Sequence, residues 1–73
     1  MTITRILASF VVKNFEMQNY QNNLIDLQEF AVLDNGTVQF RYYKYRTEMY
    51  CTETVDTLAF GKLFGIDVNK LLK

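Results

Sequence analysis

The turn motif Asp34-Asn35-Gly36-Thr37 constrains the fold of this chain more than any other feature. It lies between two runs rich in β-branched and aromatic residues. Asn-Gly in this setting predicts a two-residue β-hairpin loop, because a type I′ turn needs positive φ at both central residues. We therefore expect a core face that pairs Leu33 with Val38, Ala31 with Phe40, Glu29 with Tyr42 and Leu27 with Lys44. The opposite face then pairs Val32 with Gln39, Phe30 with Arg41 and Gln28 with Tyr43.

The flanking segments predict further strands of the same sheet. A strand is expected from about Ile3 to Phe15 because β-branched residues are dense there, although the apolar spacing of residues 3–11 also fits a helix. The polar segment 18–23 predicts a turn or loop. Residues 46–55 contain no glycine or proline, so they predict one long bent strand or a bulge near Thr47-Glu48. A sheet of three or four strands is favoured, since a lone hairpin is only marginally stable.

The C-terminal segment changes from strand to helix spacing. Thr54, Asp56 or Thr57 can cap the start of a short helix, and Gly65 fits the left-handed position after its end. Asp67 can then cap a last turn or two, with Leu71 and Leu72 facing inward. We predict an α+β fold: a small antiparallel β-meander of three to four strands with a C-terminal helix packed on one face. The apolar positions expected in the core from this region are Leu58, Phe60, Leu63, Phe64, Ile66 and Leu71.

Residues 60–73 are also similar to the middle of a helix-turn-helix, with a small residue at Gly61 and a turn glycine four positions later. The segment that would be the recognition helix has about six residues, or ~9 Å of helix. That length is too short to fill a major groove. A helix, a glycine C-cap and a terminal turn account for the same spacing.

Length and composition exclude several classes of site. The 73 residues fit one domain spanning 1–73, and the single cysteine cannot form an internal disulfide. Without histidine there is no Ser-His-Asp or Cys-His pair, and a zinc site would need several cysteines. The eight acidic residues are scattered, with no paired carboxylate motif. We therefore expect a non-enzymatic protein with no cofactor and no metal site.

The apolar segments indicate a cytoplasmic protein without a membrane span. The longest apolar run without a charge, Ile6 to Val12, is far shorter than the ~20 residues that cross a bilayer. It has no small-residue cleavage site behind it, so a signal peptide is not expected. The lone Cys51 fits a reducing compartment and predicts a half-buried small apolar residue on a strand.

One stretch has the composition of a binding site: Arg41-Tyr42-Tyr43-Lys44-Tyr45-Arg46. Strand alternation places Arg41, Tyr43 and Tyr45 on the face opposite Phe40 and Tyr42. Three interpretations stay open for this row. The tyrosines can pack structurally while the cations pair with acids, they can form a protein interface, or they can stack nucleic-acid bases. Equal numbers of acidic and basic residues disfavour nucleic acid, whose non-specific affinity is mostly electrostatic.

We expect a protein-binding module that occupies a surface of a larger partner protein. Small inhibitors and regulators carried by phages and other mobile elements, viral proteins included, are often domains of this size. The chain also carries enough apolar surface to predict a homodimer, through an edge strand or the aromatic row. A subunit of a larger assembly is a further structural alternative. The expected partner-binding residues are Arg41, Tyr43, Tyr45 and Tyr50. The alternative, single-stranded RNA or DNA binding, would use Arg41, Tyr43, Lys44, Tyr45 and Arg46.

Overall fold

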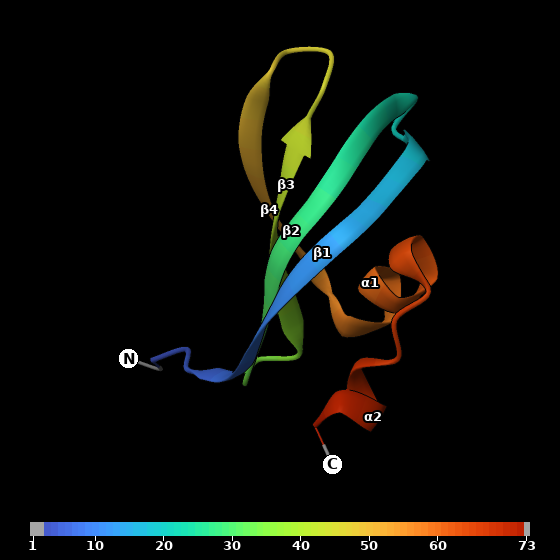
Figure 1. Cartoon of the computed structure of the whole chain (residues 1–73). Coiled ribbons are helices and arrows are strands. Elements are labelled where there is room, and N and C mark those ends of the chain that lie inside the picture. Colours follow the sequence, from blue (N-terminus) through green and yellow to red (C-terminus); the bar gives the residue numbers. More distant parts are fainter. Residues whose placement is uncertain (1–2, 73) are drawn as a thin grey trace.

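The computed structural model describes residues 3–72 as a four-stranded antiparallel sheet followed by two helices (Figure 1). The strands run in the order β1-β2-β3-β4, so each strand pairs with its neighbour in sequence. This arrangement confirms the predicted α+β meander with a C-terminal helix on one face. The elements are β1 (Ile6–Tyr20), β2 (Asn23–Leu33), β3 (Thr37–Lys44), β4 (Met49–Asp56), α1 (Thr57–Phe64) and α2 (Val68–Leu71).

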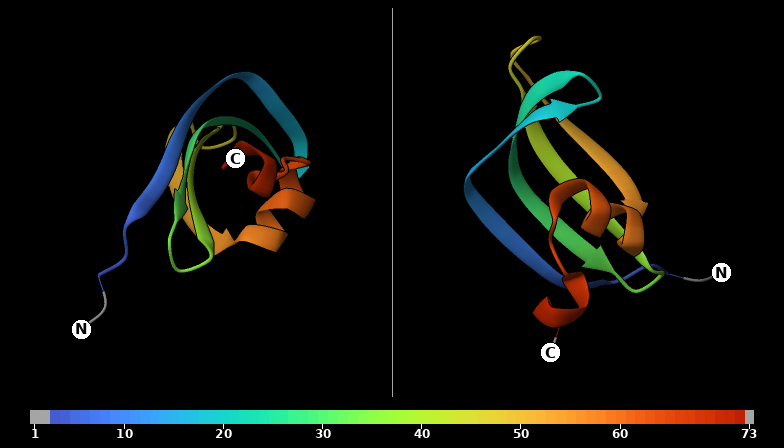
Figure 2. Two further views of the ribbon diagram at one scale, coloured as in Figure 1. Left: turned by 90° about the horizontal axis from the view of Figure 1, so that it is seen from below. Right: turned by 90° about the vertical axis from the view of Figure 1, so that its right-hand side faces the viewer.

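The sheet is strongly curved, and α1 and α2 lie on its concave side (Figure 2). Seen from below, β1 arches over the helices while α1 lies against the opposite part of the sheet. One face of each strand therefore contributes to the core, and the other forms a convex outer face. Position 3, expected to begin the first strand, precedes β1, which starts at Ile6 and continues past Phe15 to Tyr20.

The hairpin at Asn35-Gly36 is present, but its predicted loop length was wrong. Among residues 34–37 only Gly36 has positive φ, +84°, so the loop is not a type I′ turn. Val32 pairs with Val38, so the loop between Leu33 and Thr37 has three residues, 34–36. A glycine in the left-handed region is typical of such three-residue loops.

That change in loop length moves the register by one residue and exchanges the two faces of β2. Phe30 pairs with Phe40, and both are buried, as are Val32 and Val38. Ala31, which was expected to pair with Phe40 in the core, instead pairs with Gln39 on the outer face. A one-residue slip always has this effect, since side chains alternate along a strand.

The segment expected to be a turn or loop between the first two strands forms a tight turn. Tyr20 pairs with Asn23, and the two residues between them have positive φ, +50° at Gln21 and +64° at Asn22. Both central positions thus have the positive φ that a type I′ turn requires. The polar segment between β1 and β2 is therefore a two-residue hairpin loop.

The predicted long bent strand, or bulge near Thr47-Glu48, between residues 46 and 55 was wrong, because the chain reverses there. β3 ends at Lys44, which pairs with Met49, and a four-residue loop from Tyr45 to Glu48 connects the two strands. Glu48 has φ +54°, the left-handed conformation that closes the loop. The reversal brings Tyr50 directly opposite Tyr43.

Bulges explain why the sheet curves. Between the pairs Val11–Glu29 and Phe15–Leu27, β1 has three residues where β2 has only Gln28. Gln28 is itself an extra residue opposite β3, between the pairs that Leu27 and Glu29 form. Bulges bend the strand that carries them and increase its twist. The Gln28 bulge also explains why Leu27 and Phe30, three positions apart, both face the core.

The core lies between the concave face of the sheet and the helices. Phe60 and Phe64 are the buried residues of α1, and Val68 is that of α2. Asp56 caps α1 by accepting a hydrogen bond from the Ala59 N–H, and Asp67 caps α2. The fully buried or nearly buried side chains are Tyr20, Ile25, Leu27, Phe30, Val32, Val38, Phe40, Tyr42, Phe60, Phe64 and Val68.

Several leucines expected in the core are on the surface. Leu58 is 71% exposed, and Leu63, Leu71 and Leu72 are each exposed by about two fifths. Only one side of α1 contacts the sheet, and that side is occupied by Phe60 and Phe64, the buried residues of the helix. No helix within the described residues is long and apolar enough to cross a membrane.

A hydrogen bond joins the far end of β1 to β4 across the concave side. The hydroxyl of Tyr20 donates to the carboxylate of Glu53, and the Tyr20 ring stacks on Phe64 at a centroid distance of 5.9 Å. Burial, together with the Glu53 carboxylate, raises the pKa of the Tyr20 hydroxyl. Tyr20 therefore connects the two edge strands, which have no ladder between them.

Candidate functional site

The convex face of the sheet presents its side chains in rows that cross all four strands. Directly opposed residues on neighbouring antiparallel strands share a face, so the pairing defines each row. From β1 to β4, the first row is Ser9, Ala31, Gln39 and Thr54, the second is Val11, Glu29, Arg41 and Thr52, and the third is Glu16, Asp26, Tyr43 and Tyr50.

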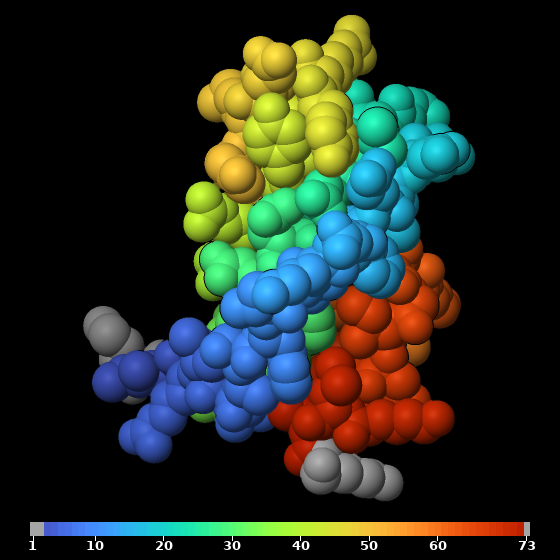
Figure 3. Space-filling model, viewed as in Figure 1, coloured from blue at the N-terminus to red at the C-terminus, as the bar shows by residue number. Residues whose placement is uncertain are grey.

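The four residues predicted to bind a partner lie together on this face. The Tyr43 ring contacts Tyr45 and Tyr50, each at a centroid distance of 5.1 Å and with an edge-on geometry. The guanidinium carbon of Arg41 lies 4.6 Å from the centre of the Tyr50 ring. We call Arg41, Tyr43, Tyr45 and Tyr50 the Arg–Tyr cluster. Figure 3 shows the end of β3 and the following loop gathered at the top of the visible face.

The cluster lies outside the core and is largely open to solvent. Tyr50 is 55% exposed and Tyr45 is 41% exposed, while Tyr43 is half-buried between them. The purely structural interpretation applies instead to Tyr20 and Tyr42, which are both buried on the concave side. Edge-on aromatic pairs contribute about 0.5–1.5 kcal/mol beyond the area they bury. The cluster is therefore a pre-arranged aromatic surface.

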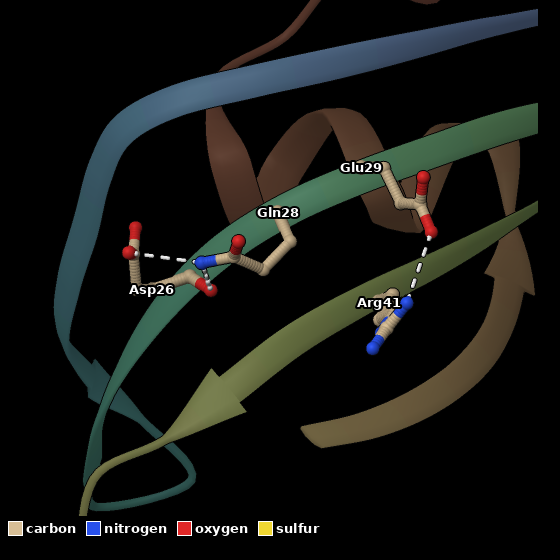
Figure 4. A network of polar contacts seen from close by, with 4 residues as sticks. All are labelled: Asp26, Gln28, Glu29 and Arg41. Atoms are coloured by element: carbon tan, nitrogen blue, oxygen red, sulfur yellow. Dashed lines mark hydrogen bonds and ion pairs between the residues drawn. The ribbon is translucent and has the colours of Figure 1, made fainter. Parts of the chain in front are cut away.

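Arg41 lies between the ring of Tyr50 and an acidic side chain. Its Nη1 lies 3.6 Å from the Oε1 of Glu29, its opposite residue on β2 (Figure 4). Next to Glu29, the Gln28 amide donates to the Oδ2 of Asp26 at 2.9 Å. Both side chains of the ion pair are about half exposed, so the pair contributes little to stability. Its main effect is to orient the guanidinium over the Tyr50 ring.

A shallow depression of about 450 Å³ adjoins the cluster on the same face. Its lining includes Glu29, Arg41, Gln39 and Thr52 from the first and second rows. A second, smaller hollow is lined by Gln28, Glu29, Arg41 and Tyr50, together with Val11. The Glu29–Arg41 pair thus separates two concave areas of an otherwise convex surface.

The structure separates the cations of the predicted nucleic-acid row. Lys44 alternates with Tyr43 and occupies a position on the concave side of β3, opposite Met49. Arg46 is exposed in the β3–β4 loop, beyond the end of the strand. Of the three cations between residues 41 and 46, only Arg41 shares the face of Tyr43, and it is paired with Glu29.

Acidic residues occupy the side of the cluster that faces β1 and β2. Asp26 stands directly opposite both Tyr43 and Glu16, so two carboxylates face each other beside the tyrosines. Within residues 3–72 the one ion pair is that between Arg41 and Glu29. The Oδ1 of Asp26 is buried without a hydrogen-bond partner in this part of the chain. Partial burial raises the pKa of the Tyr45 hydroxyl, and Glu16 and Asp26 raise it further.

Sequence reasoning missed these acidic neighbours. The expected register placed Gln28 opposite Tyr43, whereas the bulge at Gln28 and the longer loop bring Asp26 there. The one sequence signal for their placement was the alternation of acidic and basic segments along the chain. Cys51 is half-buried against the core, as predicted. Among the described residues, no three Cys, Asp or Glu side chains lie close enough together to hold a metal ion.

Known proteins provide no template for this surface. No family model matches the chain, and neither a curated protein nor a solved structure matches it. Its function is therefore inferred from the side chains of the convex face.

Proposed function

We propose that this protein is a non-enzymatic protein-binding module that acts as a small inhibitor or regulator by covering a surface of a larger partner protein. The Arg–Tyr cluster is the centre of the contact. Tyrosine and arginine are the residue types most enriched among those that dominate binding energy at protein interfaces. Both the residue types in the cluster and their exposure to solvent therefore support the proposal.

The observation that carries the proposal is the mutual packing of the cluster outside the core. Tyr43 contacts both Tyr45 and Tyr50, and Arg41 stacks on Tyr50, although these side chains are not needed to fill the interior. Side chains that hold one another in place lose less conformational freedom when a partner binds. Such a surface supports specific recognition of a protein.

Single-stranded nucleic acid is the competing ligand for the same tyrosines, and charge disfavours it. Asp26, Glu16 and Glu29 lie in the rows that contain the cluster, and the one cation there, Arg41, is already paired. A phosphate backbone would be repelled by this arrangement, because its binding depends on neutralisation by Lys and Arg. A protein partner has no such requirement.

The test is capture of a partner from extracts of cells in which the chain is natively expressed. Tyr43→Ala/Tyr50→Ala removes two adjacent rings of the cluster, and Gln39→Ala/Thr54→Ala is the matched control from the first row of the same face. We expect the wild type and the control to retain one partner protein, and the tyrosine variant to bind it at least ~10-fold more weakly.

A parallel titration of mixed-sequence single-stranded RNA and DNA at 50 and 200 mM salt separates the two ligand classes. The proposal predicts no binding up to high micromolar protein. Tight binding that weakens steeply with salt and is lost in the tyrosine variant would replace the proposal with the nucleic-acid alternative. Equal capture by both double variants would show that the partner contacts another face.

A further inference from the structure

The third row of the convex face contains two carboxylates that oppose each other with no cation between them. Glu16 on β1 pairs directly with Asp26 on β2. Like charges placed directly opposite in a sheet are destabilising. Within residues 3–72, neither side chain forms an ion pair. The fold thus carries a local concentration of negative charge that does not contribute to its stability.

Only one of the two carboxylate oxygens of Asp26 has a hydrogen-bond partner within the described residues. Its Oδ2 accepts a hydrogen bond from the Gln28 amide, but its Oδ1 is buried without a partner. A polar atom buried without a hydrogen-bond partner destabilises the fold, and more so when the group is charged. Because this oxygen is enclosed, a cation from outside the chain would be attracted by the charge of the carboxylate and not by a bond to Oδ1.

The tyrosines stand directly beside these carboxylates. Asp26 is opposite Tyr43, and the backbone N–H of Tyr45 bonds to the carbonyl oxygen of Leu24, two residues before Asp26. The charges of Glu16 and Asp26 are close enough to Tyr45 to raise the pKa of its hydroxyl. Aromatic rings and carboxylates are therefore presented together at one corner of the convex face.

The same face already shows which group fits such a corner. Arg41 lies over the Tyr50 ring at 4.6 Å and faces the Glu29 carboxylate at 3.6 Å. A guanidinium can use both contacts at once, since it stacks on an aromatic face and donates to a carboxylate in the same plane. Tyr45, Asp26 and Glu16 offer the same combination, and no Arg or Lys within residues 3–72 pairs with either carboxylate there.

We propose that the partner protein binds through a basic segment, with an Arg or Lys side chain of that segment held between Tyr45 and the carboxylates of Glu16 and Asp26. This inference rests on the proposed function and specifies the chemistry of the partner. Charge complementarity selects the occupant: an acidic peptide or a nucleic acid would add negative charge to a pair of carboxylates that already repel each other.

The test uses a labelled peptide of alternating Arg and Ser, with Glu–Ser and Lys–Ser peptides of the same length for comparison, in fluorescence anisotropy with the full chain. Glu16→Gln/Asp26→Asn removes the two charges with little change in shape. Asp34→Asn/Asp67→Asn removes two charges elsewhere while keeping oxygen acceptors at the turn and at the α2 cap.

We expect the Arg–Ser peptide to bind and the Glu–Ser peptide not to bind. The Glu16/Asp26 variant should bind the Arg–Ser peptide roughly fivefold or more weakly, whereas the Asp34/Asp67 control should bind within about twofold of wild type. The Glu16/Asp26 variant should also unfold at a higher temperature than wild type, because the opposed charges are gone. That second readout shows that the loss of binding is not a loss of fold.

Three results would overturn the inference: no binding of either basic peptide, an equal loss in both double variants, or binding of the acidic peptide. If the basic peptides fail but a partner is still captured through Tyr43 and Tyr50, the protein-binding function stands and only its basic specificity is wrong. If capture also fails and RNA binds, both proposals are wrong.

Discussion

Gly36 shows how a single backbone angle determines the β2–β3 hairpin. Its φ is +84°, and a Cβ built there would meet no atom within 4 Å. Space is therefore not the constraint, and any cost of substitution comes from the left-handed conformation.

We predict that Gly36→Ala lowers the free energy of unfolding by about 1–2 kcal/mol. Gly36→Asn should cost less, because asparagine tolerates this region better than other side chains. Urea denaturation of the three proteins measures the ranking. Equal costs for Ala and Asn would indicate that steric contact, not backbone conformation, limits this position.

Two buried tyrosines make stability depend on pH at the alkaline end. Burial raises the pKa of Tyr42 to about 12, helped by the nearby Glu53 carboxylate, and the pKa of Tyr20 is also raised. In the unfolded chain both hydroxyls ionise near their ordinary value of 10. Above that pH the unfolded state loses protons first, so unfolding becomes more favourable.

We therefore expect stability to be independent of these groups below about pH 9 and to fall from pH 10 towards 12. Urea denaturation at pH 8, 10 and 11 measures the loss. Tyr42→Phe should reduce this slope, because the variant lacks the buried hydroxyl. A wild-type stability that is flat through pH 11 would mean that the buried hydroxyls ionise as they do in water.

At the scale of elements, Tyr20 links β1 and β4, the two edges of the sheet. Its hydroxyl donates to the part-buried carboxylate of Glu53. We predict that Tyr20→Phe destabilises the fold by about 1–3 kcal/mol, because the carboxylate loses its donor while remaining partly desolvated.

Glu53→Gln is the milder comparison for this link, since an amide oxygen still accepts from the tyrosine hydroxyl. Thermal unfolding followed by circular dichroism measures both variants. If Tyr20→Phe unfolds at the wild-type temperature, the edges of the sheet are held by packing of the ring alone.

Sequence reasoning was most successful where structure depends on neighbouring residues. Local chemistry or strict alternation predicts the hairpin position, the left-handed Gly65 and the opposite faces of Arg41 and Tyr42. It also predicts the three candidate caps of α1, of which Asp56 is the one used. These signals act within a few residues of the chain. They were enough to predict that Arg41, Tyr43 and Tyr45 share a face.

The bulges could not be predicted in the same way. The extra residues in β1 and at Gln28 let the sheet curve around Phe60 and Phe64, which are distant in sequence. Each bulge changes which residues face outward, so the acidic neighbours of the tyrosines emerge only from the three-dimensional register. The exposure of Leu58 could not be predicted either, because it depends on which side of α1 contacts the sheet.

At the scale of the whole molecule, the open edge of β1 favours self-association. β1 pairs with β2 on one side only, and Ile6, Leu7 and Val11 are each more than half exposed. Unpaired strand edges with apolar side chains promote pairing with a second copy. The predicted homodimer therefore has a suitable surface along the edge of β1, where Val11 adjoins the hollow that Arg41 and Tyr50 also line.

We expect the apparent mass in sedimentation equilibrium to rise above the 8.6 kDa of one chain as concentration increases. Val11→Lys should keep the mass at that of the monomer, because a charge on an edge strand opposes pairing. A control, Leu58→Lys on α1, should associate like wild type. Association that persists in Val11→Lys but is lost in Tyr50→Ala would assign the dimer to the aromatic surface.

The most direct test of the central claim is site-specific photo-crosslinking in the cells that natively express the chain. A photoreactive phenylalanine derivative at Thr52 lies beside Arg41 and leaves the Arg–Tyr cluster intact. The same group at Leu58, 71% exposed on α1, samples the other side of the molecule. We predict a cross-link from Thr52 to a larger protein and none from Leu58. A protein cross-linked only from Leu58, or a nuclease-sensitive product from Thr52, would contradict the assignment of the convex face to a protein partner.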